Sequence, residues 1–235
     1  ESGTRAEEST RKAHKTTRDA ATNPFINLYE NVLLSTENWQ DYDVVGISIV
    51  GISQIIPGLT LARMIKEKYP HLHITLGGPI FSVNAGQLIG HPEFFDDFCH
   101  SVVTFEGEEP MHRLLSALKA GDSLSTVPNL LHLDGREVVQ NKERVELRFE
   151  ELPHPDFDGL PMDKYLSPYP ILPVLQSRGC YWGKCTFCTH SFVYGHRYGK
   201  QKTQAMVDEL EKLMKKYNTK YFTFSDEAVS PHSLN

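Results

Sequence analysis

The sequence predicts an α/β fold built around a parallel sheet with helices on its faces. Apolar runs rich in β-branched residues alternate with segments whose apolar residues recur at helical spacing. The first run, Asp43–Val50, is apolar at almost every position, which is typical of a strand buried on both faces of a parallel sheet. This alternation indicates a doubly wound sheet, and ligands of such sheets bind beyond the carboxyl ends of the strands.

Residues 1–24 form a polar lead-in that we expect to be disordered or loosely helical, and residues 25–128 form the first domain. The expected strands of this domain are residues 43–50, 73–76 and 101–105, and its expected helices are residues 25–39, 57–69, 84–98 and a helix that begins near Pro110. Because the carboxyl ends of parallel strands share one edge of a sheet, the residues that follow the strands should lie together. They are Ser48, Gly51, Gly77, Gly78, Glu106 and Gly107.

Residues 129–170 are expected to connect two domains. Asp134-Gly135 lies between two strand-like runs, and this dipeptide is a strong signal for a two-residue hairpin turn. The stretch from residue 151 to residue 170 is rich in proline and has few periodic apolar positions, so we predict an ordered linker.

Residues 171–235 contain one strand–helix–strand unit. The apolar run Ile171–Gln176 and the run Lys220–Ser225 predict strands, and Thr203 is the expected N-cap of a strongly amphipathic helix between them. One such unit cannot bury both of its faces alone. We therefore expect roughly 150 to 250 further residues in the complete protein, and no turnover from a protein that ends at Asn235.

The composition limits the function classes that are open to the chain. The apolar share of 40% over 235 residues allows a sizeable core. The formal net charge of −6 argues against a nucleic-acid partner, because such proteins neutralise phosphates with an excess of Lys and Arg. No apolar run is long enough to span a bilayer, and the N-terminus lacks a signal-peptide pattern, so we expect a cytoplasmic protein without a membrane partner.

The segment with the clearest chemistry holds three of the four cysteines within nine residues. Clustered cysteines in a reducing compartment are more often metal ligands than disulfides. Cys180, Cys185 and Cys188 could hold three irons of a [4Fe–4S] cluster and leave the fourth iron open to a small molecule. With His190 they could instead form a Cys₃His zinc site, in a non-catalytic α/β binding module. The spacing favours these two sites about equally.

The stretch from Pro173 to Cys188 resembles the cluster loop of the radical S-adenosylmethionine (SAM) superfamily. In that family three cysteines hold the cluster, and its open iron binds SAM, which is cleaved to a 5′-deoxyadenosyl radical. The loop follows the first strand of a partial (β/α)₆ barrel, so the resemblance implies that residues 171–235 are the first part of such a barrel. It also implies SAM contacts for Phe187 and for the acidic strand end made of Ser225, Asp226 and Glu227.

The spacing C-x₄-C-x₂-C departs from the commonest spacing of that family, C-x₃-C-x₂-C. With the extra residue in Tyr181–Lys184, the loop resembles a subgroup that carries cobalamin-type N-terminal domains. The segments Asp43–Ser48, Leu76–Pro79 and Phe105–Pro110 resemble successive strand ends of such a Rossmann-like domain. The resemblance places the nucleotide tail of cobalamin along Ser48, Gly77, Gly78, Glu106 and Gly107. No D-x-H-x-x-G motif is present, so no histidine is assigned as a cobalt ligand.

The resemblance thus implies a radical SAM enzyme, either a cobalamin-dependent methyltransferase or a related modifying enzyme. Its substrate would be a natural-product peptide or a small metabolite, and a small electron-transfer protein would supply the reducing electron. No residue is assigned as catalytic. The alternative is the zinc-bearing binding module.

Overall fold

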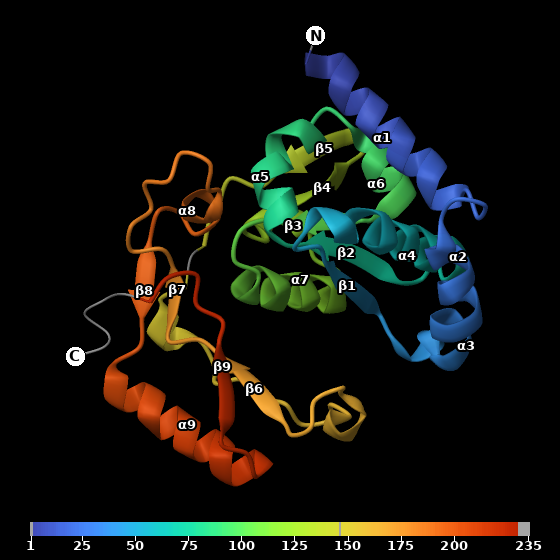
Figure 1. Cartoon of the computed structure of the whole chain (residues 1–235). Coiled ribbons are helices and arrows are strands. Elements are labelled where there is room, and N and C mark those ends of the chain that lie inside the picture. The colour runs from blue at the N-terminus through green and yellow to red at the C-terminus, as the bar shows by residue number, and fades with distance from the viewer. Residues whose placement is uncertain (1, 146, 230–235) are drawn as a thin grey trace. The chain divides into compact units, whose positions relative to one another are not determined.

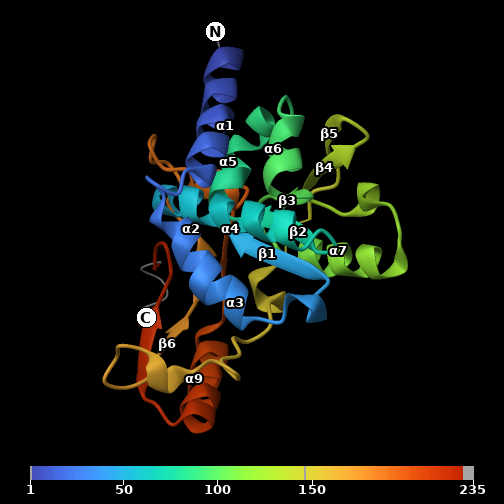
Figure 2. The same cartoon turned by 90° about the vertical axis from the view of Figure 1, so that its right-hand side faces the viewer.

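The computed structural model describes residues 2–145 and 147–229, which belong to two compact units, Glu1–Val145 and Glu146–Asn235. A five-stranded sheet organises the first unit, with its strands in the order β1-β2-β3-β4-β5 (Figures 1 and 2). The strands are β1 (Val44–Ser48), β2 (His73–Gly77), β3 (Ser101–Val103), β4 (Leu130–Asp134) and β5 (Glu137–Gln140). The first three are parallel, which confirms the predicted α/β fold, and β4 and β5 are antiparallel.

The helices of this unit are α1 (Ser2–Arg18), α2 (Pro24–Leu28), α3 (Leu34–Thr36), α4 (Ile55–Lys68), α5 (Pro79–Leu88), α6 (Pro92–Phe98) and α7 (Glu108–Ala120). Short helical turns cover Tyr29–Leu33, Trp39–Asp41, Ile52–Gln54 and Leu124–Thr126. The single helix expected over residues 84–98 is two helices, because Pro92 cannot continue α5 and takes the first position of α6. No helix in the described part of the chain is both long and apolar enough to cross a membrane.

The polar lead-in is a regular helix, α1, that is tied to α4. Arg63 of α4 donates a hydrogen bond to the backbone oxygen of Thr17 at 2.7 Å, and Arg18 pairs with Glu67 at 3.0 Å. Asn23, which follows the helix, donates to the hydroxyl of Thr60 at 2.8 Å. These tertiary contacts order a segment whose composition alone would leave it loosely structured.

The two faces of the sheet are covered unequally. The larger core lies between one face and helices α4, α5 and α6, around the fully buried Ile65, Ile74 and Phe95 (Figure 1). On the other face α7 packs over β3 and β4, where Leu114 meets Val103 and Leu130. Beside α7, β1 carries the exposed residues Gly46 and Ser48. This uncovered part of the sheet is where the first candidate site lies.

The predicted hairpin turns at Gly135, whose φ of +63° lies in the left-handed region that favours glycine. Its first strand, β4, pairs with β3, so the hairpin extends the sheet of the first unit. Asn129 then ties in the following segment, because its side chain donates to the backbone oxygen of Val145 at 2.9 Å and accepts from the backbone nitrogen of Val145 at 3.2 Å. The first compact unit accordingly ends at Val145, whereas the sequence places a domain boundary after residue 128.

The second unit contains the predicted strand–helix–strand arrangement. The parallel strands β6 (Ile171–Val174) and β9 (Tyr221–Phe224) pair, and α9 (Thr203–Tyr217) covers one face of the pair through Leu172, Val174, Met206 and Leu213. A second pair, β7 (Ser177–Gly179) with β8 (Tyr198–Lys200), is antiparallel, and α8 spans His190–Val193. Helical turns cover Phe149–Glu151 and Met162–Lys164. Thr203 is the first residue of α9 rather than its N-cap, because Lys202 takes the extended cap conformation.

The proline-rich segment lies along α9 within this unit. His154 contacts the buried carboxylate of Glu209 at 2.6 Å, and the hydroxyl of Tyr217 accepts from the backbone nitrogen of Phe157 at 2.8 Å. Lys216 pairs with Asp156 at 2.9 Å. These contacts fix the segment that leads into β6, the strand before the cysteine loop.

Candidate functional site

A cavity of about 330 Å³ lies at the carboxyl ends of β1, β2 and β3 in the first unit. Four of the residues that the sequence assigns to cobalamin line it: Ser48, Gly77, Gly78 and Gly107. The fifth, Glu106, is buried next to this lining, and Asn129 donates to its backbone oxygen at 3.4 Å. The strand ends therefore meet as a parallel sheet requires, and the cavity occupies the place where such sheets bind ligands.

The glycines of this rim serve two different purposes. Gly78 has a φ of +107°, and a Cβ there would lie 2.3 Å from the backbone oxygen of Ile49, so only glycine fits. At Gly77 the nearest atom to an added Cβ would be the backbone oxygen of Val103 at 3.6 Å, which is ordinary contact. Gly78 is thus required by the fold, whereas Gly77 leaves space that a ligand could occupy.

Seven further residues line the cavity without being assigned from the sequence, among them Gly46, Phe105 and Met111. A glycine inside a β-branched strand often marks a place where a ligand or another backbone approaches closely. Gly46 could have been found in this way. Phe105 could not be found in this way, because its left-handed backbone (φ +61°) depends on tertiary contacts. Its backbone nitrogen donates to the hydroxyl of Ser82 at 2.7 Å, and the guanidinium of Arg144 lies 3.7 Å from its ring centroid.

The cysteine loop of the second unit begins directly after β7. Gly179 precedes it with a φ of +85°, and a Cβ there would lie 2.2 Å from the backbone oxygen of Arg197. Within the loop a turn is closed by the backbone nitrogen of Cys188, which donates to the oxygen of Cys185 at 3.2 Å. Cys185 is exposed, and Cys180 and Cys188 are half-buried and free of disulfides. All three thiols are therefore open to a soft metal centre.

Within the described residues, no three His, Cys, Asp or Glu side chains are gathered closely enough to hold a metal ion. The chemistry of the donor set nevertheless fits an iron–sulfur cluster, since Cys180, Cys185 and Cys188 are three accessible thiols on one loop. His190, the fourth ligand of the zinc alternative, lies with its Nδ1 3.9 Å from the carboxylate of Glu227. That contact favours neither metal.

Besides Glu227, three residues are predicted to contact SAM, and each lies in a different setting. Phe187 is 88% exposed on the cysteine loop. Ser225 continues the pairing of β9, with its backbone nitrogen donating to Val174 at 2.9 Å. Asp226 accepts a hydrogen bond from the backbone nitrogen of Ser177 at 2.6 Å, which brings the acidic strand end to the start of the cysteine loop. The structure thus joins two segments that lie about fifty residues apart in the chain.

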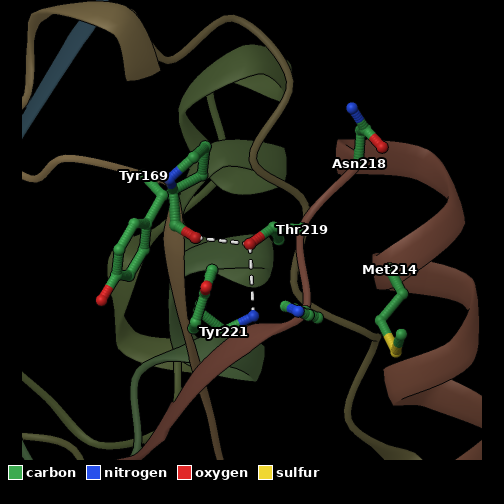
Figure 3. Close-up of a pocket in the computed structure, with 7 residues that line it drawn as sticks. Tyr169, Met214, Asn218, Thr219 and Tyr221 are labelled. Atoms are coloured by element: carbon green, nitrogen blue, oxygen red, sulfur yellow. Dashed lines mark hydrogen bonds between the residues drawn. The ribbon is translucent and has the colours of Figure 1, made fainter.

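A second cavity of about 330 Å³ in this unit lies at the opposite, amino ends of β6 and β9 (Figure 3). Tyr169 and Tyr221 stack there with their ring centroids 3.8 Å apart. The hydroxyl of Thr219 donates to the backbone oxygen of Pro170 at 2.5 Å and accepts from the backbone nitrogen of Tyr221 at 3.2 Å. These bonds close the turn from α9 into β9, which is a structural role.

No protein-family model matches the chain. A protein of Pyrococcus horikoshii described as an uncharacterized methyltransferase is 29% identical over 192 residues, which cover 81% of this chain. The anaerobic magnesium-protoporphyrin IX monomethyl ester cyclase of Cereibacter sphaeroides is 26% identical over 189 residues, or 76% of this chain. The matched regions span only 40% and 30% of these two relatives.

Two solved structures share the fold. The cobalamin-dependent SAM radical enzyme OxsB matches with a TM-score of 0.63 at 24% identity, over 86% of this chain and 27% of that one. The radical SAM methyltransferase TsrM from Kitasatospora setae matches with a TM-score of 0.59 at 18% identity, over 86% of this chain and 39% of that one. Over most of its length, the chain therefore has the fold of the cobalamin-dependent radical SAM enzymes that its sequence resembles.

Proposed function

We propose that the chain is part of a cobalamin-dependent radical SAM enzyme, a methyltransferase or a related modifying enzyme. One observation carries the proposal. The cysteine loop and the acidic strand end Ser225–Glu227 meet at the carboxyl ends of the paired strands β6 and β9, through the hydrogen bond between Ser177 and Asp226. A three-cysteine loop that meets a polar strand end is the arrangement that the family resemblance implies for a cluster with SAM.

In this proposal Cys180, Cys185 and Cys188 hold a [4Fe–4S] cluster. When bound, the cluster would supply the electron that cleaves SAM reductively. The ring of Phe187 is exposed and so is free to lie against an adenine, while Ser225, Asp226 and Glu227 form the strand end that faces the SAM amino group. A small electron-transfer protein would reduce the cluster. The expected substrate remains a natural-product peptide or a small metabolite.

The cavity at the carboxyl ends of β1, β2 and β3 is proposed to hold the tail of cobalamin. When bound, the corrinoid would carry the methyl group that is transferred. The small side chains of Ser48, Gly77 and Gly107 support this assignment, because a large ligand must approach the backbone closely. The division into a cobalamin-type domain and the start of a radical SAM barrel is part of the same proposal.

Anaerobic reconstitution with iron and sulfide tests the cluster. The wild-type chain should bind iron and show the brown absorbance of an iron–sulfur cluster. Cys185→Ala should lose the cluster, because the third thiolate is gone, whereas Cys99→Ala removes a fully buried thiol elsewhere and should keep it. Stoichiometric zinc without cluster formation would support the binding module and contradict the proposal.

Titration with hydroxocobalamin tests the cavity. Gly46→Val places a side chain in the cavity, and its Cβ would meet Thr75 and Met111 only at 3.8 and 3.9 Å, so the fold should tolerate it. We expect its affinity to fall at least about tenfold, because the ligand and the new side chain would compete for the same space. Gly90→Val, at an exposed glycine with open space around it, is the matched control and should bind like the wild type.

A further inference from the structure

We infer that Asp226 is a positioning residue that fixes the start of the cysteine loop, and that Glu227 is the carboxylate left to face SAM. The inference deepens the proposed function and rests on it for the identity of what the loop holds. It divides the acidic strand end into two residues with different tasks.

The carboxylate of Asp226 accepts three hydrogen bonds from two consecutive residues. Its Oδ2 accepts from the backbone nitrogen of Gln176 at 3.2 Å. Its Oδ1 accepts from the backbone nitrogen of Ser177 at 2.6 Å and also from the hydroxyl of Ser177. Ser177 is 1% exposed, so its two donors have little access to water, whereas Gln176 and Asp226 are half-buried.

An ionised carboxylate offers about four lone-pair positions. Three of those at Asp226 point to Gln176 and Ser177, which leaves little capacity for the ammonium group of a bound SAM. Bonds from buried donors to a charged acceptor are also stronger than neutral ones. A ligand would have to displace these bonds to use Asp226, and the two donors of the buried Ser177 would then lack partners.

The two donor residues lie where the chain changes partners. Up to Val174 it belongs to β6 and pairs with β9, and from Ser177 it belongs to β7 and pairs with β8. On the β8 side, the backbone nitrogen of Gln201 donates to the oxygen of Gln176 at 2.9 Å. Asp226 therefore clamps the branch point between the two strand pairs.

The segment from this branch point to the first cysteine has little conformational freedom. Gly179 contacts the backbone of Arg197 so closely that no other residue fits there, and Cys180 follows directly. The position of Ser177 consequently determines where Cys180 begins the loop. Through that link Asp226 orients a cluster ligand without touching the cluster.

Glu227 has no comparable set of donors in the contacts described. Its side chain is 18% exposed and lies 3.9 Å from the imidazole of His190, which follows the loop. Its carboxylate thus lies on the side of the cysteine loop and keeps room for a ligand, which Asp226 does not.

Amide hydrogen exchange on the metal-free chain tests the clamp. In Asp226→Asn the amide group can no longer accept from both backbone nitrogens, so exchange at Gln176 and Ser177 should accelerate at least about tenfold. Ser177→Ala removes one donor, and its Gln176 amide should show a smaller acceleration. Asp208→Asn, on the exposed face of α9, is the matched control and should leave both amides unchanged. Unchanged exchange in Asp226→Asn would overturn the clamp.

Reconstitution separates positioning from direct binding. Asp226→Asn should bind about half the wild-type iron or less and broaden the EPR signal of the reduced cluster, while SAM affinity per cluster stays within about threefold of wild type. Glu227→Gln should keep its iron and weaken SAM binding about tenfold. The reverse pattern, with Asp226→Asn keeping iron and EPR signal but losing SAM, would make Asp226 a direct ligand. A wild-type chain that takes up no iron would contradict the proposed function, and the exchange data would still decide the clamp.

Discussion

Gly78 and Gly46 are both at the cavity of the first unit, yet the structure gives them different tolerances. Gly78 sits in a backbone region that is almost closed to other residues, and its α-carbon faces the backbone of Ile49. Gly46 has ordinary backbone angles and only distant neighbours for a Cβ. Substitutions at the two positions should therefore separate an effect on folding from an effect on the ligand.

Gly78→Ala should destabilise the chain by at least about 3 kcal/mol, from backbone strain and from overlap with the oxygen of Ile49. The free energy of unfolding in urea measures this loss. Gly86→Ala is the matched control, since this exposed glycine of α5 has nothing within 4 Å of an added Cβ. It should be neutral or stabilise by up to about 1 kcal/mol, because alanine favours helix. Equal stability of the two variants would contradict the argument.

His73 and His100 form a half-buried pair in the first unit that predicts acid sensitivity. Their ring centroids are 5.1 Å apart, and His73 contacts the hydroxyl of Ser101 at 2.9 Å. Burial lowers the pKa of each to about 4, with a further contribution from Lys66 and, for His73, from His100. In the unfolded chain both would titrate near the ordinary value of 6.5.

The unfolded chain therefore binds more protons than the folded chain between pH 6.5 and 4, and stability should fall as the pH falls through that range. After discounting for partial exposure, we expect a loss on the order of 1–2 kcal/mol between pH 7 and pH 5. Urea unfolding at both pH values measures it. His73→Gln should reduce the pH dependence, and His112→Gln, at an exposed histidine, should leave it unchanged.

At the scale of elements, the pair β6–β9 depends on α9. A two-stranded sheet is marginal by itself, and here α9 supplies an apolar stripe that covers Leu172 and Val174. Helical periodicity in the sequence was enough to predict this stripe. The small size of the core means that each of its side chains carries a large share of the unit's stability.

Leu213 is only 4% exposed, so Leu213→Ala leaves a cavity beside Leu172. The substitution should lower the free energy of unfolding of the second unit by about 2–5 kcal/mol. Faster amide exchange in β6 and β9 would report it. Val207→Ala on the same helix, at a side chain that is 42% exposed, should change stability by less than about 0.5 kcal/mol. Similar exchange in both variants would show that α9 does not hold the strand pair.

At the scale of the whole molecule, the position at which the first unit ends decides which fragment of the chain can fold by itself. Leu130 and Leu131 of β4 are fully buried, one in each of the two apolar clusters that flank the sheet. A domain that ended at residue 128 would lose both of them together with the antiparallel strands. The apolar clusters of this sheet are complete within residues up to Val138.

A fragment of residues 1–145 should therefore fold cooperatively, whereas a fragment of residues 1–128 should not. Circular dichroism and the sharpness of urea unfolding distinguish the two. A well-folded shorter fragment would show that the hairpin is an accessory to the sheet. The longer fragment should also retain the affinity for hydroxocobalamin, since the residues that line the cavity all precede residue 128.

The sequence by itself determined the parallel strands, the hairpin, α9 and the three-cysteine loop. These features are local: hydrophobic periodicity, glycine at strand ends and the spacing of Cys180, Cys185 and Cys188 are written in short stretches. The rule that parallel strands end at one edge placed six residues on this rim. Four of them, Ser48, Gly77, Gly78 and Gly107, line the cavity, and Gly51 and Glu106 do not.

Tertiary structure alone decided the rest, because it depends on segments that are distant in the chain. The ordering of α1 requires Arg63, the inclusion of β4 in the sheet requires β3, and the backbone of Phe105 requires Ser82. Asp226 shows the difference most clearly. Its place in an acidic strand end could be read from the sequence, but its three hydrogen bonds to Gln176 and Ser177 form only when β9 lies beside β6.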